Sequence, residues 1–117
     1  MKIIIELIPP SNNRFIGRSA QWEYRAIKKE WEALVHIACI GKPKKHFERA
    51  SVHIHYCFPD RIRRDPDNYS GKMILDGLVK AGVLQDDNFN CIQLILSASV
   101  DPKRPRTEIT IQELDKT

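Results

Sequence analysis

Near the middle of the chain, the sequence reads Ala50-Ser51-Val52-His53-Ile54-His55-Tyr56-Cys57-Phe58-Pro59. The residue types alternate, so that valine, isoleucine and tyrosine share one face while the two histidines and the cysteine share the other. A period of two is typical of a β-strand that has one face in the core. Proline cannot donate to a sheet ladder, so we expect this strand to end at Phe58.

Two elements are expected before this strand. Residues 2–8 are rich in isoleucine, and the two prolines that follow should end a first strand there. Residues 20–40 carry apolar side chains at helical spacing, with Ser19 as the cap and Gly41 at the exit. We therefore expect a long amphipathic helix between the first two strands.

Three elements are expected after it. The apolar face of residues 68–81 indicates a second helix, with Asp67 able to cap its free amides and Gly82 suited to a left-handed exit. Residues 91–100 and 107–114 read as two strands. We expect the segment between them to make a β-hairpin with a basic tip.

The order β-α-β-α-β-β predicts an α+β fold. It is a two-layer sandwich in which two helices cover one face of a four-stranded mixed sheet, because right-handed crossovers put both helices on the same side. The chain has 117 residues, which is near the usual size of a single domain. We therefore expect one domain over residues 1–117.

The composition favours an anionic partner. The chain has a formal net charge of +4 at pH 7, and its basic side chains collect in three segments that read as loops. These are Lys42, Lys44 and Lys45; Arg61, Arg63 and Arg64; and Lys103, Arg104 and Arg106. No apolar run approaches the roughly 20 residues that span a bilayer, and the first residues do not resemble a signal peptide. We expect an intracellular, cytoplasmic protein without a membrane partner.

The cysteines and two of the histidines give only weak indications of a disulfide or a metal site. Three cysteines, widely spaced and never in a C-x-x-C pair, argue against a disulfide framework or a zinc knuckle. Cys57 shares a strand face with His53 and His55, which is a weak candidate for a transition-metal site because a fourth ligand is not evident. Trp22 is a candidate for stacking on nucleic-acid bases.

Carboxylates lie on both sides of the second predicted helix. Asp65 and Asp67 come two residues apart before it, and Asp86 and Asp87 follow it in a turn. Clustered carboxylates repel each other unless a cation gathers them, and oxygen ligands suit Mg²⁺ or Mn²⁺ better than zinc. Such a metal activates a bound water and stabilises charge on an attacked phosphate, to which Lys72 could donate. The cluster predicts a metal-dependent phosphodiesterase.

Each of these features also has a simpler interpretation. Asp67 could serve as a helix cap, Lys72 and Asp76 could form a surface ion pair, and the two aspartates at positions 86 and 87 could belong to an ordinary turn. Taken singly, each simpler interpretation is the better one. Their combination beside three arginines favours the catalytic interpretation.

Three segments make a specific pattern in this order along the chain. They are Pro9-Pro10-Ser11-Asn12-Asn13-Arg14, then Arg64-Asp65-Pro66-Asp67-Asn68, then Asp76-Gly77-Leu78-Val79-Lys80-Ala81-Gly82-Val83-Leu84-Gln85-Asp86-Asp87. The pattern resembles the RusA family of Holliday-junction resolvases, and the likeness spans nearly the whole chain. Capping or turn chemistry alone would not require all three segments.

The resemblance implies a homodimeric, Mg²⁺-dependent endodeoxyribonuclease of DNA recombination and repair that makes paired symmetric nicks in four-way junctions. By motif, the metal ligands fall on Asp65, Asp67, Asp86 and Asp87, and the catalytic groups on Asp65, Asp67, Asp87 and Lys72. Lys72 lies five residues after Asp67, where the family pattern has four. We interpret Gly71 as a one-residue insertion that loosens the start of the helix.

We assign phosphate contacts to basic side chains of the predicted loops, which are Arg14, Arg61, Arg63, Arg64, Lys103, Arg104 and Arg106. An isologous dimer is reasonable on physical grounds, since a junction with two-fold symmetry needs two incisions and the dimer supplies two identical sites.

Two alternative functions stay open. One is a related metal-dependent nuclease that acts on other branched or single-stranded DNA, and the other is a non-catalytic DNA-binding module.

Overall fold

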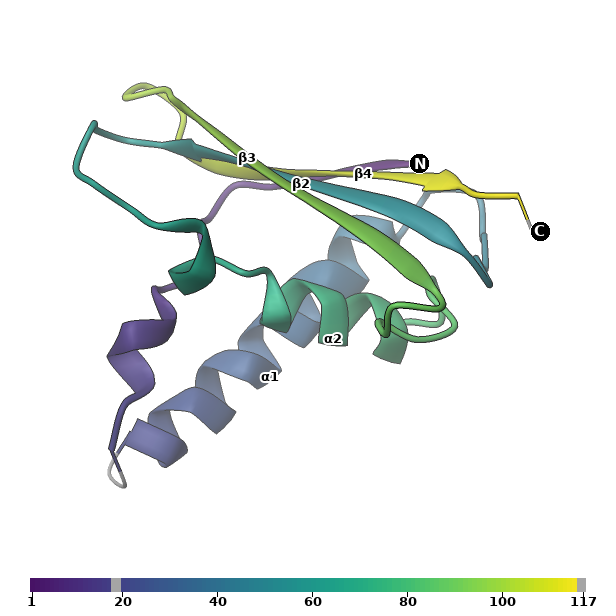
Figure 1. Ribbon diagram of the computed structural model, residues 1–117, viewed down its shortest axis with the longest axis horizontal. Coiled ribbons are helices and arrows are strands. Elements are labelled where there is room, and N and C mark those ends of the chain that lie inside the picture. The colour runs from purple at the N-terminus through teal and green to yellow at the C-terminus, as the bar shows by residue number, and fades with distance from the viewer. Residues whose placement is uncertain (18–19, 116–117) are drawn as a thin grey trace.

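The computed structural model describes residues 1–17 and 20–115 of the chain. Its strands are β1 (Lys2–Ile5), β2 (Ala50–Phe58), β3 (Ile92–Val100) and β4 (Arg106–Glu113). Its α-helices are α1 (Ala20–Cys39) and α2 (Lys72–Lys80), and two short 3₁₀ helices are η1 (Asn12–Phe15) and η2 (Pro66–Asn68). Figure 1 shows these elements in their spatial arrangement.

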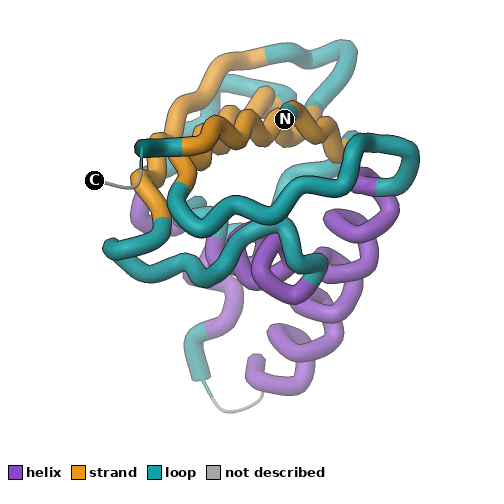
Figure 2. Tube along the Cα trace, turned by 90° about the vertical axis from the view of Figure 1, so that its right-hand side faces the viewer, coloured by secondary structure: helices purple, strands orange, loops and turns teal. Residues whose placement is uncertain are grey.

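The elements form two layers, with the sheet on one side and both α-helices on the other (Figures 1 and 2). The strand order is β1-β4-β2-β3, in which β2 and β3 are parallel and β4 is antiparallel to both of its neighbours. β1, β2 and β3 therefore run in the same direction, and each crossover moves the same way across the sheet. Crossovers of one hand put their helices on one face, so the predicted α+β sandwich is confirmed.

The predicted hairpin between the last two strands is wrong. β4 crosses the end of β2 and pairs with it on the side away from β3, so β2 separates the two strands that are adjacent in sequence. The connection runs over the end of β2, where the Asp101 amide donates to the Phe58 carbonyl at 2.8 Å. Burial explains the choice: Ile109 and Ile111 are fully buried in this inner position, whereas β3 is mostly exposed and suits an edge.

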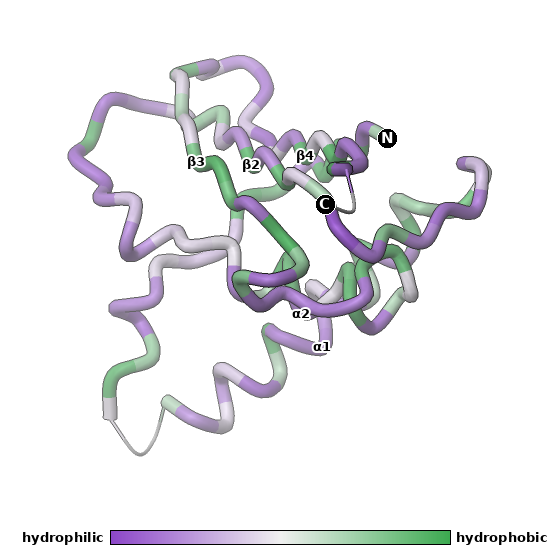
Figure 3. Tube along the Cα trace, turned by 45° about the vertical axis from the view of Figure 1, so that its right-hand side comes forward, coloured by the Kyte–Doolittle hydropathy of each residue, from purple (hydrophilic) through white to green (hydrophobic). Residues whose placement is uncertain are grey.

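The core lies between the sheet and the helices. Val52, Ile54 and Tyr56 of β2 point into it and are nearly fully buried, as the alternating pattern predicted. Figure 3 shows hydrophobic and hydrophilic residues alternating along β2 and β4. β3 shares this register, because Leu94 pairs with Val52, but its edge position leaves Leu94 39% exposed. The helix-side face of β3 is therefore only partly covered.

The second helix begins later than predicted. α2 starts at Lys72, and Gly71 before it has φ of 79°, a left-handed conformation that favours glycine. A Cβ atom at Gly71 would also collide with the Ile54 side chain. Asp67 therefore does not cap this helix, and Gly71 lies before the helix in a left-handed conformation rather than in a loosened first turn. Ser19, the predicted cap of the first helix, lies outside the described residues.

α1 has the length that a bilayer requires, but six charged residues lie in the stretch from Glu23 to Glu32. Within residues 1–17 and 20–115, no helix combines the length and the apolar character of a membrane span.

Candidate active site

The loop after β2 carries the first predicted carboxylates and is held from within by Arg64. Its guanidinium group stacks on the Phe58 ring, 4.4 Å from the centroid, and lies 2.9 Å from Asp60 Oδ1. It also donates to the carbonyls of Asp60 and Ile62 at 3.2 and 3.1 Å. The hydrogen bond from Arg64 lowers the pKa of Asp60. Arg64 thus holds the loop in shape, and these contacts limit the freedom of its guanidinium group to contact phosphate.

Asp65 directly precedes η2 at the end of this loop, and Asp67 lies within η2. Asp65 precedes η2, its carboxylate accepts a hydrogen bond from Arg63 at 3.2 Å, and its side chain is about half exposed. Asp67 is exposed, and its carbonyl accepts a hydrogen bond from the Asn12 side chain at 3.1 Å. The same Asn12 amide donates to Ser70 Oγ at 3.2 Å. The segment after β1 therefore braces the loop that carries Asp67.

Lys72 stands at the first position of α2 and faces carboxylates from two directions. Its Nζ lies 3.1 Å from Asp76 Oδ1, one turn along the helix, and 3.9 Å from Asp87 Oδ2. Asp76 also forms an ion pair with Lys28 of α1, whose Nζ lies 3.6 Å from Asp76 Oδ2. The hydrogen bond that Lys72 donates to Asp76, helped by the charges of Asp76 and Asp87, raises the pKa of Lys72. The ammonium group is therefore held protonated at neutral pH.

The two adjacent aspartates after α2 have different surroundings. Asp86 Oδ1 accepts from the Asp87 backbone amide at 2.7 Å, and Asp86 Oδ2 accepts from the Asn88 side chain at 3.2 Å. Both oxygens of Asp86 are thus used inside the turn. The Asp87 carboxylate faces Lys72 instead. Of the two aspartates, Asp87 is therefore the one whose carboxylate lies near the candidate catalytic residue Lys72.

The carboxylates on the two sides of α2 lie along the uncovered face of β3. A hollow of about 90 Å³ beside Asp65 is bordered by residues 96–98, and one of about 560 Å³ beside Asp87 is bordered by residues 92–94. The centres of these strand segments are four residues, or about 13 Å, apart. Among the described residues, no three His, Cys, Asp or Glu side chains are grouped closely enough to hold a metal ion. The donors are oxygen atoms of the kind that Mg²⁺ takes, but they do not form one ligand set.

The predicted phosphate contacts divide into paired and unpaired side chains. Arg104 pairs with Glu6, and Arg106 lies 2.7 Å from Asp101 and 2.8 Å from Glu108. Hydrogen bonds from these arginines lower the pKa of each of the three carboxyl groups. Arg14 forms an ion pair with Glu23. Within the described part of the chain, the predicted basic side chains outside any ion pair are Arg61 and Lys103.

The histidines of β2 make hydrogen bonds on the open face of the sheet. Ser97 Oγ lies 2.6 Å from both His53 Nε2 and His55 Nδ1, and Ser99 Oγ lies 2.8 Å from His55 Nε2. Serine neighbours on β3 thus satisfy these rings. The transition-metal interpretation gains nothing from the described residues, since His53, His55 and Cys57 are not part of any metal-sized group.

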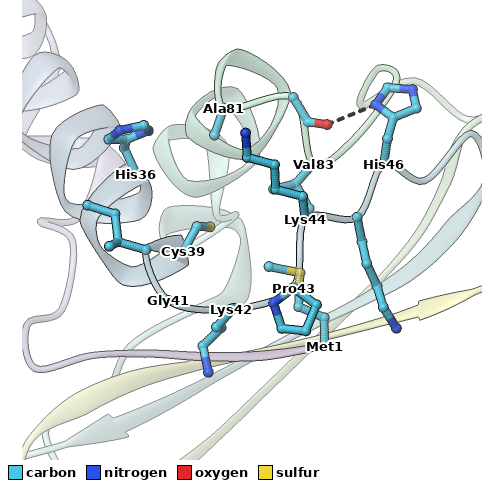
Figure 4. Close-up of a pocket in the computed structure, with 13 residues that line it drawn as sticks. Met1, His36, Cys39, Gly41, Lys42, Pro43, Lys44, His46, Ala81 and Val83 are labelled. Atoms are coloured by element: carbon cyan, nitrogen blue, oxygen red, sulfur yellow. Dashed lines mark hydrogen bonds between the residues drawn. The ribbon is translucent and has the colours of Figure 1, made fainter.

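A further hollow lies between the C-terminal ends of α1 and α2, away from the aspartates. It has a volume of about 590 Å³ and is lined by residues 36–46 in part and by residues 81–83. Figure 4 shows the Lys44 side chain extending toward Ala81, whereas Lys42 points away. The dashed line marks the 2.8 Å contact between His46 Nδ1 and the Gly82 carbonyl. His46 Nε2 lies 2.9 Å from Gln85 Oε1, so this histidine contacts the chain just before Asp86.

Residues 7–112 match the family model described as endodeoxyribonuclease RusA. The chain belongs to the RusA family. The match includes all three segments of the sequence pattern and every candidate residue. RusA proteins are Holliday-junction resolvases, so this chain is an endodeoxyribonuclease of that class. A search of curated proteins gave no match.

Sequence reasoning missed one positioning residue of the RusA site. Asn12 lies in the first segment of the pattern, but only Arg14 of that segment received a role. The signal was the segment itself, because an asparagine after a strand can donate from its side-chain amide to a distant loop. Trp22 is 79% exposed on α1, and its stacking role stays a prediction.

Proposed function

We propose that the protein resolves Holliday junctions as a homodimer in DNA recombination and repair, by Mg²⁺-dependent hydrolysis that makes paired symmetric nicks. Mn²⁺ is expected to substitute for Mg²⁺. The observation that carries the proposal is the approach of Lys72 to Asp87 beside the loop of Asp65 and Asp67, within a chain of the RusA family. The catalytic groups of the proposal are Asp65, Asp67, Asp87 and Lys72.

Lys72 has the properties of a group that stabilises developing negative charge. Its pKa is raised by Asp76 and Asp87, so the ammonium does not lose its proton near neutral pH. Its side chain is 57% exposed and can therefore reach a phosphate oxygen. A fixed cation at this position is worth most when charge builds up on the attacked phosphate or on the leaving oxygen. Asp76 positions Lys72 rather than touching DNA.

The metal proposal rests on donor chemistry. Asp65, Asp67, Asp86 and Asp87 all offer carboxylate oxygens, which suit Mg²⁺ and Mn²⁺. When bound, such an ion lowers the pKa of its water and neutralises phosphate charge. Asp87 is the better candidate of the adjacent pair, because both oxygens of Asp86 already accept hydrogen bonds in the turn.

DNA binding is proposed to depend on the basic loops at the end of the sheet where β2 and β3 finish. Arg61 and Lys103 are exposed there and have no carboxylate partner among the described residues, so phosphate contacts displace no ion pair. Arg14, Arg63, Arg64, Arg104 and Arg106 would have to share their charge with a carboxylate. Such contacts make binding steeply dependent on salt and nearly independent of sequence.

The experiment compares wild type with Asp67→Asn on a synthetic four-way junction. Wild type with Mg²⁺ should convert the junction to nicked duplexes with two symmetric cuts, and addition of EDTA should stop it. Asp67→Asn should bind without cutting. Equal cleavage by Asp67→Asn, or none by wild type in Mg²⁺ or Mn²⁺, would contradict the mechanism.

The same preparation distinguishes the junction from other substrates and tests the dimer. Equally fast cleavage of a linear duplex or of single-stranded DNA would remove the resolvase assignment but leave the nuclease. Light scattering should give the mass of a dimer. A strict monomer that still made paired cuts would contradict the symmetric arrangement.

A further inference from the structure

Phe89 projects into solvent two residues after Asp87. Its side chain is 103% exposed, the highest exposure of any large hydrophobic residue among those described. A phenylalanine gains about 1.5–3 kcal/mol when it is buried, so a partner that covered this fully exposed ring would gain binding free energy. Its position beside a candidate catalytic aspartate suggests that this partner is the substrate.

The turn that carries Phe89 is held by its own hydrogen bonds. Asn88 Oδ1 accepts from the Asn90 amide at 2.9 Å, and the Asn88 carbonyl accepts from Cys91 and Ile92 at 3.0 and 3.1 Å. The Asn88 side chain also donates to Asp86 at 3.2 Å. The ring is therefore presented on a braced turn, and little ordering is needed when it makes contact.

The hollow of about 560 Å³ beside Asp87 includes Phe89 in its wall. Leu75, Ile92 and Leu94 also line it, and Asn88 and Gln93 border it. Asp87 is the one charged residue among those that line it. The rest of the lining is uncharged, and its apolar side chains suit a flat, uncharged ring.

We propose that this hollow receives a nucleobase of the substrate that has left its stack, with the base lying against the Phe89 ring. The inference rests on the proposed function, and it offers a physical reason why the protein would prefer branched DNA to a continuous duplex. Bases at a branch point unstack more easily than bases in a continuous duplex, so filling the hollow costs less on a junction. Stacking on an aromatic ring tolerates any base, because every base has a π-face.

A binding experiment in the non-cleaving Asp67→Asn background tests the base. Phe89→Ala should weaken binding to a four-way junction by about 5- to 100-fold and change binding to linear duplex less than twofold. Phe89→Trp should keep the junction affinity because it keeps a stacking surface. Ile37→Ala, which removes an exposed apolar side chain from α1, is the matched control and should leave both affinities unchanged.

A fluorescent base supplies a second readout. 2-Aminopurine at the branch point should brighten when Asp67→Asn protein unstacks it, and this rise should vanish with Phe89→Ala added. Equal junction affinity and equal fluorescence with and without Phe89 would overturn the inference, while junction cleavage by the wild-type protein would still stand. A junction neither bound nor cut by wild type would overturn the proposed function and this inference together.

A second copy of the chain is the competing occupant of the hollow. Light scattering of Phe89→Ala should give the same mass as wild type over a dilution series. A fall in mass caused by Phe89→Ala would show that the ring contacts the other subunit and would overturn the assignment to DNA. Because Phe89 packs on nothing, the variant should retain the wild-type melting temperature.

Discussion

Lys72 Nζ lies 3.9 Å from Asp87 Oδ2, although fifteen residues separate them along the chain. The chain turns sharply at the end of α2, where the amides of Val83 and Leu84 both donate to the Leu78 carbonyl. This reversal returns the following segment along the helix. As a result, a cation and a carboxylate meet where an attacked phosphate would need both charge stabilisation and oxygen ligands.

Replacing Lys72 should impair the chemical step more than binding. With Lys72→Met, we expect kcat for junction cleavage to fall about 10²- to 10³-fold, because the cation is lost where charge develops. Junction affinity should change only a few-fold, and Lys72→Arg should restore part of kcat. Single-turnover cleavage with titrated DNA separates the two effects. Equal loss of affinity and of kcat by Lys72→Met would assign the side chain to binding.

The adjacent aspartates should respond differently to the same substitution. Asp87→Asn should abolish cleavage, because it removes a charge that faces Lys72. Asp86→Asn should retain most of the cleavage, since an amide oxygen can still accept from the Asp87 backbone. Steady-state cleavage by each variant, with circular dichroism to check folding, makes the comparison. The reverse ranking would exchange the two roles.

Gly71 and Gly82 form a matched pair for stability. Both have φ of 79°, but a Cβ would collide with Ile54 at Gly71 and would meet nothing within 4 Å at Gly82. Gly82→Ala should cost about 1–2 kcal/mol, the cost of a left-handed alanine. Gly71→Ala should cost about 1–3 kcal/mol more, because it also overpacks the core. Urea unfolding gives both free energies, and equal values would show that Ile54 relaxes freely.

His46 should make the chain before Asp86 sensitive to pH. Its ring nitrogens face the Gly82 carbonyl and Gln85 Oε1, and a protonated ring can donate to both. These hydrogen bonds raise the pKa of His46. A raised folded-state pKa means that the stabilisation is complete below the ordinary value of about 6.5 and is lost as pH rises through the folded value.

The urea midpoint of His46→Ala should therefore fall further below wild type at about pH 5.5 than at about pH 8.5. Gln85→Leu should reduce this difference, because it removes one of the two acceptors. An NMR titration of the imidazole in wild type should give a pKa above the ordinary histidine value. A midpoint difference that is the same at both pH values would refute the role of the charged ring.

Asn12 should affect activity without touching DNA. Asn12→Ala removes the donor to the Asp67 carbonyl and to Ser70, so the loop of Asp67 should loosen. We expect cleavage to fall several-fold and amide exchange at residues 67–70 to become faster. Asn13→Ala is the neighbouring control, since it leaves these hydrogen bonds in place, and should behave as wild type. Unchanged exchange in Asn12→Ala would remove the bracing role.

Local patterns predicted the local elements well. The alternation over residues 50–58 located β2 with both of its ends, and helical spacing located α1 to within one residue at its C-terminus. The start of α2 was missed because a 3₁₀ turn and Gly71 intervene, and Gly71 takes a left-handed conformation close to the Ile54 side chain. The hairpin was wrong because strand pairing follows burial across the whole sheet, which adjacency in sequence does not report.

In the candidate site, too, the sequence indicated the residue types but not which side chains lie close together. The pattern selected Asp65, Asp67, Lys72 and the aspartates after α2 as candidates, but spacing could not tell which of the last two faces Lys72. That choice depends on the turn, where Asp86 accepts two short-range hydrogen bonds. The ion pairs that occupy Arg104 and Arg106 were also unpredictable, because Glu6 and Arg104 are far apart in sequence.

The position of β4 between β1 and β2 has a consequence for synthesis. A chain emerges from the ribosome N-terminus first, at about 5–20 residues per second. Among the described residues, β1 pairs only with β4, so the first strand stays without a sheet partner until residues 106–113 have appeared. Any translation product that stops before β4 therefore lacks the strand that joins β1 to the rest of the sheet.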